Sequence, residues 1–121
     1  MIVVVADDDL HSRGILTATF RAMGMEVFEA ETGNSAYELI QAHSVDLVVS
    51  DIRMPDGTGV ELLRRMRRMM QEKGSAPPVI ITTAMLEGGE GYLRALGARD
   101  VLMKPLDLDA VVASARKILG L

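Results

Sequence analysis

Polar side chains that could do chemistry follow or end short apolar runs at separate points of the chain. Asp7 and Asp8 follow the first run, Asp51 follows another, Thr83 ends a later one, and Lys104 follows the last. Clustered carboxylates repel one another and raise each other's pKa unless a cation neutralises them. Mg²⁺ suits such a cluster, because it prefers oxygen ligands and binds through one or two carboxylates together with a phosphate.

A carboxylate, Mg²⁺ and a lysine together suit phosphoryl transfer, whose transition state spreads negative charge over the phosphoryl oxygens. A carboxylate can itself be the nucleophile and form an aspartyl phosphate. In this interpretation Asp51 attacks, the metal bridges, Lys104 holds one phosphoryl oxygen and Thr83 donates a hydrogen bond to another. Taken singly, Lys104 could be a surface lysine and Thr83 an ordinary strand residue, so the interpretation requires that all of them meet.

These side chains can meet only if the apolar runs are strands of one sheet. Several runs are apolar throughout, which is typical of parallel strands covered on both faces. The predicted strands are residues 2–6, 27–28, 47–50, 79–83 and 101–103. The segments between them show the spacing of amphipathic helices, for example in the apolar stripes Leu63, Met66, Met70 and Leu108, Val112, Ala115, Leu119.

The repeated strand–helix order predicts the α/β class: a single doubly wound (βα)5 domain with helices on both faces of a five-stranded parallel sheet. We expect the flavodoxin-like strand order 2-1-3-4-5, in which ligands bind at the carboxyl ends of the strands. Ser35 and Thr58 each begin a capping-box pattern, and Asp107 is the predicted N-cap of the last helix. Glycines at 88, 89 and 91 predict that the fourth helix starts late or is mobile.

Composition excludes several other classes of function. The 121 residues include no cysteine and only two histidines, so disulfides are absent and a zinc site is a poor expectation. The net charge of −4 does not favour nucleic acid or an anionic membrane as a direct partner. No apolar run is long enough to span a membrane, and the first residues lack the basic and long apolar regions of a signal peptide, so we expect a soluble, cytoplasmic protein.

Four short motifs in this order resemble the receiver domain of two-component response regulators, the CheY-like family. They are Ala6-Asp7-Asp8-Asp9, Ser50-Asp51-Ile52-Arg53-Met54-Pro55, Thr82-Thr83-Ala84 and Lys104-Pro105. The likeness covers essentially the whole chain, so one receiver domain is expected over residues 1–121.

The resemblance implies a role for each matching residue. Asp51 matches the phosphoacceptor, and Asp7 and Asp8 match the acidic pair that binds Mg²⁺ together with Asp51. The backbone carbonyl of Arg53 matches a further metal ligand. Thr83 matches the switch hydroxyl and Lys104 the site lysine, with a cis peptide bond expected before Pro105.

The resemblance also implies partners. A sensor histidine kinase or a histidine phosphotransfer protein would donate the phosphoryl group, and the domain would catalyse only its own phosphorylation and dephosphorylation. The output would pass to a downstream protein or to an output domain outside this sequence. The chain could be a stand-alone receiver or part of a longer protein, and either a monomer or a phosphorylation-dependent dimer.

Some positions depart from the family pattern. Val101 stands where many members carry an aromatic residue that turns inward on activation, so coupling from Thr83 must take another route. Arg53 and Met85 occupy two positions thought to tune hydrolysis, and neither is a carboxylate that could orient water. These residues predict a long-lived phosphoryl group.

Two other classes of function stay open. An aspartyl-phosphate hydrolase would gain from a second carboxylate two residues after the nucleophile, but Arg53 stands there. A receiver-like interaction module that never needs phosphorylation would have no reason to keep Asp7, Asp8, Asp51 and Lys104 together.

Overall fold

Strands and helices alternate along the whole chain in the computed structural model, which describes residues 1–84 and 89–121. The strands are β1 (Ile2–Ala6), β2 (Glu26–Ala30), β3 (Leu47–Asp51), β4 (Val79–Thr83) and β5 (Asp100–Met103). The helices are α1 (Leu10–Ala22), α2 (Gly33–Ala42), α3 (Gly59–Lys73), α4 (Glu90–Ala95) and α5 (Leu108–Leu119). No helix within the described residues is long and apolar enough to cross a membrane.

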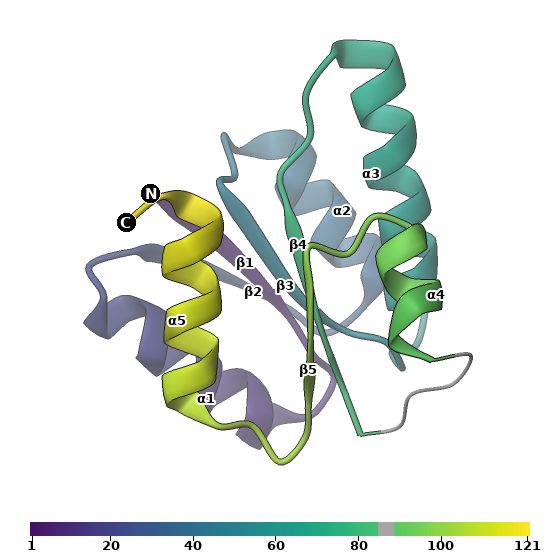
Figure 1. Cartoon of the computed structure of the whole chain (residues 1–121). Coiled ribbons are helices and arrows are strands. Elements are labelled where there is room, and N and C mark those ends of the chain that lie inside the picture. Colours follow the sequence, from purple (N-terminus) through teal and green to yellow (C-terminus); the bar gives the residue numbers. More distant parts are fainter. Residues whose placement is uncertain (85–88) are drawn as a thin grey trace.

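The strands form one parallel sheet in the order β2-β1-β3-β4-β5, which confirms the predicted topology. Helices α1 and α5 cover one face, and α2, α3 and α4 cover the other (Figure 1). All carboxyl ends of the strands therefore lie along one edge of the sheet, which is the lower edge in Figure 1.

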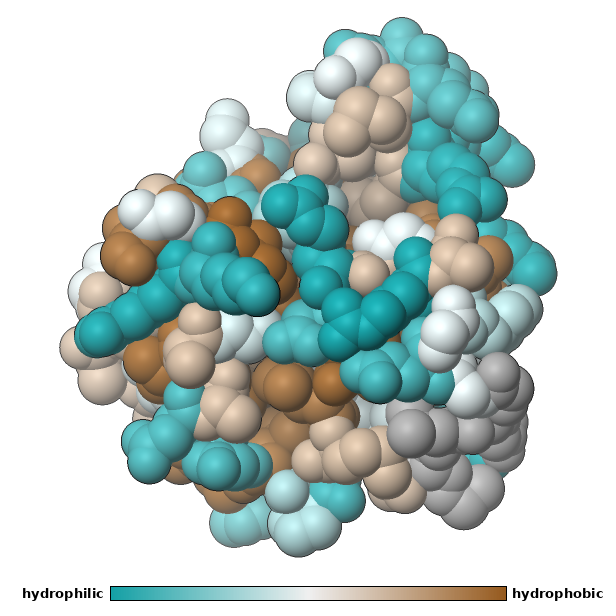
Figure 2. Space-filling model, in the orientation of Figure 1, coloured by the Kyte–Doolittle hydropathy of each residue, from teal (hydrophilic) through white to brown (hydrophobic). Residues whose placement is uncertain are grey.

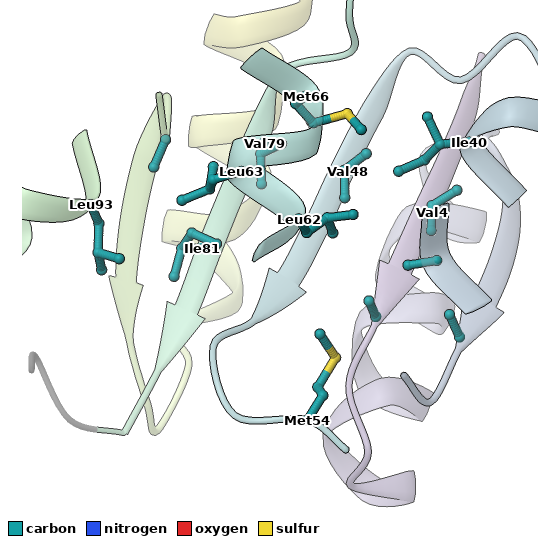
Figure 3. Close-up of a cluster of buried hydrophobic side chains, with 14 of the residues drawn as sticks. Val4, Ile40, Val48, Met54, Leu62, Leu63, Met66, Val79, Ile81 and Leu93 are labelled. Carbon is teal, nitrogen blue, oxygen red and sulfur yellow. The ribbon is translucent and has the colours of Figure 1, made fainter. Parts of the chain in front are cut away.

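Alternate residues of the central strands enter two separate cores. Val4, Val48 and Ile81 lie on the face of the sheet that α2, α3 and α4 cover, and they share one core with Leu62 and Leu63 of α3 (Figure 3). The neighbouring strand residues pack on the other face against apolar side chains of α1 and α5. The strands are buried on both sides, which explains their nearly continuous apolar sequence.

Several helix boundaries agree with the sequence and one does not. Thr58 caps α3 by accepting a hydrogen bond from the Glu61 amide, and Asp107 caps α5. The prediction that Ser35 begins α2 is wrong. Thr32 is the N-cap, and its hydroxyl accepts from the Ser35 amide 2.9 Å away. The cap therefore lies one turn earlier, where the backbone is still extended.

Two predicted apolar stripes are partly wrong. On α3, Met66 and Met69 are buried but Met70 is 50% exposed. On α5, Val111 and Ala115 are buried while Leu108, the first helical residue, is 40% exposed. Each stripe includes a residue at the margin of the buried face, so tertiary packing rather than spacing decides which residues enter the core.

The fourth helix begins late, as its glycines predicted. It spans only Glu90–Ala95, and it follows Gly89, which has a positive φ of 85°. That this helix is mobile stays a prediction, and Met85, for which a role in hydrolysis was suggested, lies outside the described residues.

Candidate functional site

Three charged side chains from separate strand ends meet at the carboxyl edge of the sheet. Asp51 is the last residue of β3, Asp7 follows β1 directly, and Lys104 follows β5 directly. The Lys104 Nζ atom lies 2.9 Å from an Oδ2 atom of both Asp7 and Asp51. The predicted meeting of these three residues is therefore observed, and the Lys104–Pro105 peptide bond is cis as expected.

Asp7 is fully buried, and each of its polar atoms has a partner. Its amide donates to the Ala30 carbonyl at 3.0 Å, and its own carbonyl accepts from Arg13 at 2.8 Å. Its carboxylate accepts from the Asp9 amide and from Lys104, both at 2.9 Å. A buried carboxylate is costly unless it is paired in this way, so Asp7 is fixed in place before any ligand binds.

Asp51 is less deeply buried than Asp7, and 13% of its side chain is exposed. One carboxylate oxygen accepts from the Ile52 amide at 2.7 Å, and the other accepts from Lys104. The exposed part is what a nucleophile needs, because an incoming phosphoryl group must reach a carboxylate oxygen.

The start of α3 packs closely on the backbone of Asp51. The Gly59 amide donates to the Ile52 carbonyl at 2.9 Å, and a Cβ atom at position 59 would lie 2.5 Å from the Asp51 carbonyl oxygen. Only glycine fits there without a shift. The sequence shows a glycine in this turn, but the close approach depends on how α3 packs and was missed.

The loop between β3 and α3 is also tied to the start of α2. The Gly33 amide donates to the Gly57 carbonyl at 3.0 Å, and the Asn34 amide donates to the Asp56 carbonyl at 2.9 Å. Asp56 and Gly57 both have positive φ angles. This contact joins segments far apart in the chain, and no local pattern in the sequence could have revealed it.

Asp7, Asp8 and Asp51 form a set of oxygen donors suited to a hard cation. One carboxylate oxygen from each lies within 4.8 Å of the others, and Asp8 is exposed. Lys104 supplies one positive charge against these three carboxylates, so negative charge remains for a divalent ion to neutralise. The donor set therefore fits Mg²⁺. Arg53 lies in the following loop with an exposed side chain, and the role of its carbonyl remains a prediction.

The surroundings of Lys104 favour its charged form. Burial by itself lowers the pKa of this amine, but hydrogen bonds and charge interactions with Asp51 and Asp7 outweigh burial and raise the pKa above its ordinary value. The ammonium group is thus kept as a donor for an anionic ligand.

Two consecutive threonines end β4 beside Asp51. Thr82 pairs with Asp51 in the sheet register, and Thr83 follows it, with its carbonyl accepting from the Lys104 amide at 2.8 Å. Both side chains are buried. The Thr82 hydroxyl finds no hydrogen-bond partner among the described residues, whereas Thr83 is engaged. The structure thus places Thr83 at the predicted edge.

A 2-1-3-4-5 parallel sheet with an acidic pocket and a lysine at its carboxyl edge defines the class of CheY-like receivers. The sequence matches the response regulator receiver domain family over residues 3–116. The chain therefore belongs to this family and is a receiver domain of two-component signalling, as the resemblance of its motifs predicted. Receiver domains generally bind Mg²⁺ at an acidic pocket.

Individual relatives agree with this assignment. The transcriptional regulatory protein ZraR of Escherichia coli K12 is 36% identical over 120 residues, which are 98% of this chain and 26% of that protein. The aerobic respiration control sensor protein ArcB of the same organism is 32% identical, with coverages of 96% and 15%. The chemotaxis response regulator CheY4 of Vibrio cholerae is 27% identical, with a TM-score of 0.85 and 98% coverage of both chains. This chain thus spans about a quarter or less of the two larger relatives.

Proposed function

We propose that Asp51 accepts a phosphoryl group from a sensor histidine kinase or a histidine phosphotransfer protein. Asp7, Asp8, Asp51 and the Arg53 carbonyl would hold Mg²⁺ for this reaction. The observation that supports the proposal is the bridge from the Lys104 ammonium group to Asp7 and Asp51, because it holds a positive charge beside the carboxylate that would take the phosphoryl group. We infer that the domain spans residues 1–121 and catalyses only its own phosphorylation and dephosphorylation.

The chemistry follows from the positions of these groups. A carboxylate oxygen of Asp51 forms a bond to phosphorus while the bond from phosphorus to the donor imidazole nitrogen breaks, and the imidazole leaves with the electron pair. Mg²⁺ would neutralise charge on the phosphoryl oxygens during this transfer. Lys104 exchanges part of its contact with Asp51 for a phosphoryl oxygen, and the Thr83 hydroxyl donates to another.

Apolar residues beside the site offer a surface for the phosphodonor. Leu10 and Ile15 of α1 are 72% and 37% exposed, and Leu108 of α5 is 40% exposed. Ile15 and Leu108 line one shallow cleft together with Pro105, next to Lys104. A helical partner that covers this cleft would bring its phosphohistidine to the same edge of the sheet. Because an ATP-dependent kinase supplies the group, we place the reaction in the cytoplasm.

The output face in this proposal is formed by α4, β5 and α5. Tyr92 and Met103 are 44% and 45% exposed there, and Figure 2 shows brown, hydrophobic side chains over β5 between hydrophilic ones on α5 and α4. Phosphorylation would shift the population of α4 positions and so change what this face binds. The partner that binds this face would be a downstream protein, an output domain, or a second copy in a phosphorylation-dependent dimer.

A polar network ties the three elements of this face together. Arg94 of α4 donates to Asp100 of β5 at 2.9 Å, and the Ser114 hydroxyl of α5 donates to the other Asp100 oxygen at 2.5 Å. Burial alone would raise the pKa of Asp100, but the hydrogen bonds from Ser114, from its neighbouring amide and from Arg94 lower it overall. Because Val101 offers no rotating aromatic ring, we propose that this network carries the movement of α4.

Beryllofluoride with Mg²⁺ tests the proposal, because it mimics a phosphoryl group on a carboxylate. We expect amide shifts in a ¹H–¹⁵N spectrum around Asp51, Lys104 and α4 of the wild type. Asp51→Asn should show none of them. Equal shifts in both proteins would exclude Asp51 as the acceptor, and a wild type without any response would favour the phosphorylation-independent interaction module.

A further inference from the structure

Arg13 of α1 is a charged residue that is only 7% exposed. A buried guanidinium is costly unless its donors are paired. Its Nη1 atom donates to the Asp7 carbonyl at 2.8 Å. Its Nε atom donates to Glu29 at 3.2 Å, and its Nη2 atom donates to Glu31 at 3.3 Å. One guanidinium therefore joins α1 to β2, to the segment after β2, and to the acidic loop after β1.

The contact with the Asp7 carbonyl has a geometric consequence for Asp8. This carbonyl belongs to the peptide group that joins Asp7 to Asp8, and a peptide group is a rigid plane. The Asp7 amide and both of its carboxylate oxygens already have partners. Fixing the carbonyl as well fixes the plane, and with it the direction in which the exposed Asp8 leaves the buried Asp7.

The charges around Arg13 are balanced in a way that suits a neighbouring cation site. The carboxylates of Glu29 and Glu31 outnumber the single guanidinium, so the cluster adds no net positive charge beside Asp7 and Asp8. A lysine would bring the same charge but not the planar fork of donors, which reaches acceptors in several directions at once.

We propose that Arg13 is a positioning residue of the divalent-cation site, which orients the Asp7–Asp8 peptide while Glu29 and Glu31 cancel its charge. The inference rests on the proposed function, since it concerns the same Mg²⁺ site. Arg13 touches neither the metal nor the phosphoryl group and acts through the backbone between the two acids.

Calorimetric titration with MgCl2 tests this role in the full chain without phosphorylation. Mutation of a residue that hydrogen-bonds to a metal ligand typically lowers metal affinity by about 10–100-fold. We therefore expect Arg13→Met to weaken Mg²⁺ binding by about tenfold. Arg13→Lys should recover only part of the loss. Phe20→Leu is the matched control, because Phe20 is also buried on α1 but packs into the core away from the site. It should lower stability and leave Mg²⁺ affinity unchanged.

A double variant, Glu29→Gln with Glu31→Gln, covers the case in which Arg13→Met does not fold. The amide oxygens still accept from Arg13, but its charge is no longer cancelled, so Mg²⁺ binding should weaken several-fold, and more strongly at low salt. If the wild type binds Mg²⁺ and both Arg13→Lys and the double variant bind it with the same affinity, the role of Arg13 is overturned but the metal site is not. A wild type that does not bind Mg²⁺ would overturn the proposed metal site and this inference together.

Discussion

Gly59→Ala should damage both stability and phosphorylation, because a new methyl group would collide with the backbone of the acceptor residue. The added Cβ would lie 2.5 Å from the Asp51 carbonyl oxygen, and contacts below 3.0 Å are essentially never seen for real Cβ atoms. The nearest atoms belong to the backbone of Asp51 and Ile52, so no flexible side chain can move aside. Either the start of α3 or the end of β3 has to shift.

The size of the effect follows from two known costs. Overpacking of this kind costs about 1–3 kcal/mol. A displacement of roughly 1 Å at reacting groups can slow a reaction by about 10²-fold, and a shift of half that size should slow phosphorylation of Asp51 by about tenfold. Urea unfolding measures the first effect, and the rate of phosphorylation by acetyl phosphate, followed by mass spectrometry, measures the second.

Gly14→Ala is the matched control for this change. Gly14 lies in α1, and a Cβ atom there would meet nothing within 4 Å. Alanine should therefore stabilise the protein by about 0.5–1 kcal/mol through helix propensity and leave the acetyl phosphate reaction unchanged. If Gly59→Ala matched this control in both stability and rate, the account of how α3 positions Asp51 would be wrong.

Three further predictions concern the switch and the lifetime of the modification. Thr83→Ala should still be phosphorylated but show smaller amide shifts in α4, whereas Thr82→Val should behave like the wild type or gain stability, because its buried hydroxyl has no partner among the described residues. Ser114→Ala should raise the pKa of Asp100, measured by carboxyl ¹³C shifts. Because the pKa of Asp100 is lowered in the folded protein, its charged form stabilises the fold above the ordinary pKa, and this stabilisation is lost as the pH falls through the folded pKa. The free energy of unfolding in urea should therefore fall less over this pH range in Ser114→Ala than in the wild type. Arg53→Glu should shorten the half-life of the phosphorylated protein, by placing a carboxylate where it can orient water; an unchanged decay rate would remove Arg53 from that role.

The central strands and the edge residues were predictable because their signals are local. Val3, Val48 and Ile81 lie in runs apolar enough to identify buried parallel strands. Parallel topology then brings Asp7, Asp51 and Lys104 to one edge, whatever the details of packing.

The parts that sequence could not provide depend on tertiary contacts. Ser35 fits the capping-box pattern, but the path of the chain after β2 makes Thr32 the cap. From sequence alone Arg13 looks like an ordinary surface charge, and only the structure shows its hydrogen bond to the Asp7 carbonyl. From sequence alone Gly59 looks like an ordinary turn residue, and only the structure shows how closely α3 packs against the end of β3 there.

Mass spectrometry of the protein treated with acetyl phosphate and MgCl2 tests whether Asp51 takes the phosphoryl group. We predict the mass of one added phosphoryl group in the wild type, its location on Asp51 after proteolysis, and no addition in Asp51→Asn. Chelation of Mg²⁺ should abolish the reaction. Phosphoryl addition to Asp51→Asn at the wild-type rate, or its location on another residue, would contradict the account.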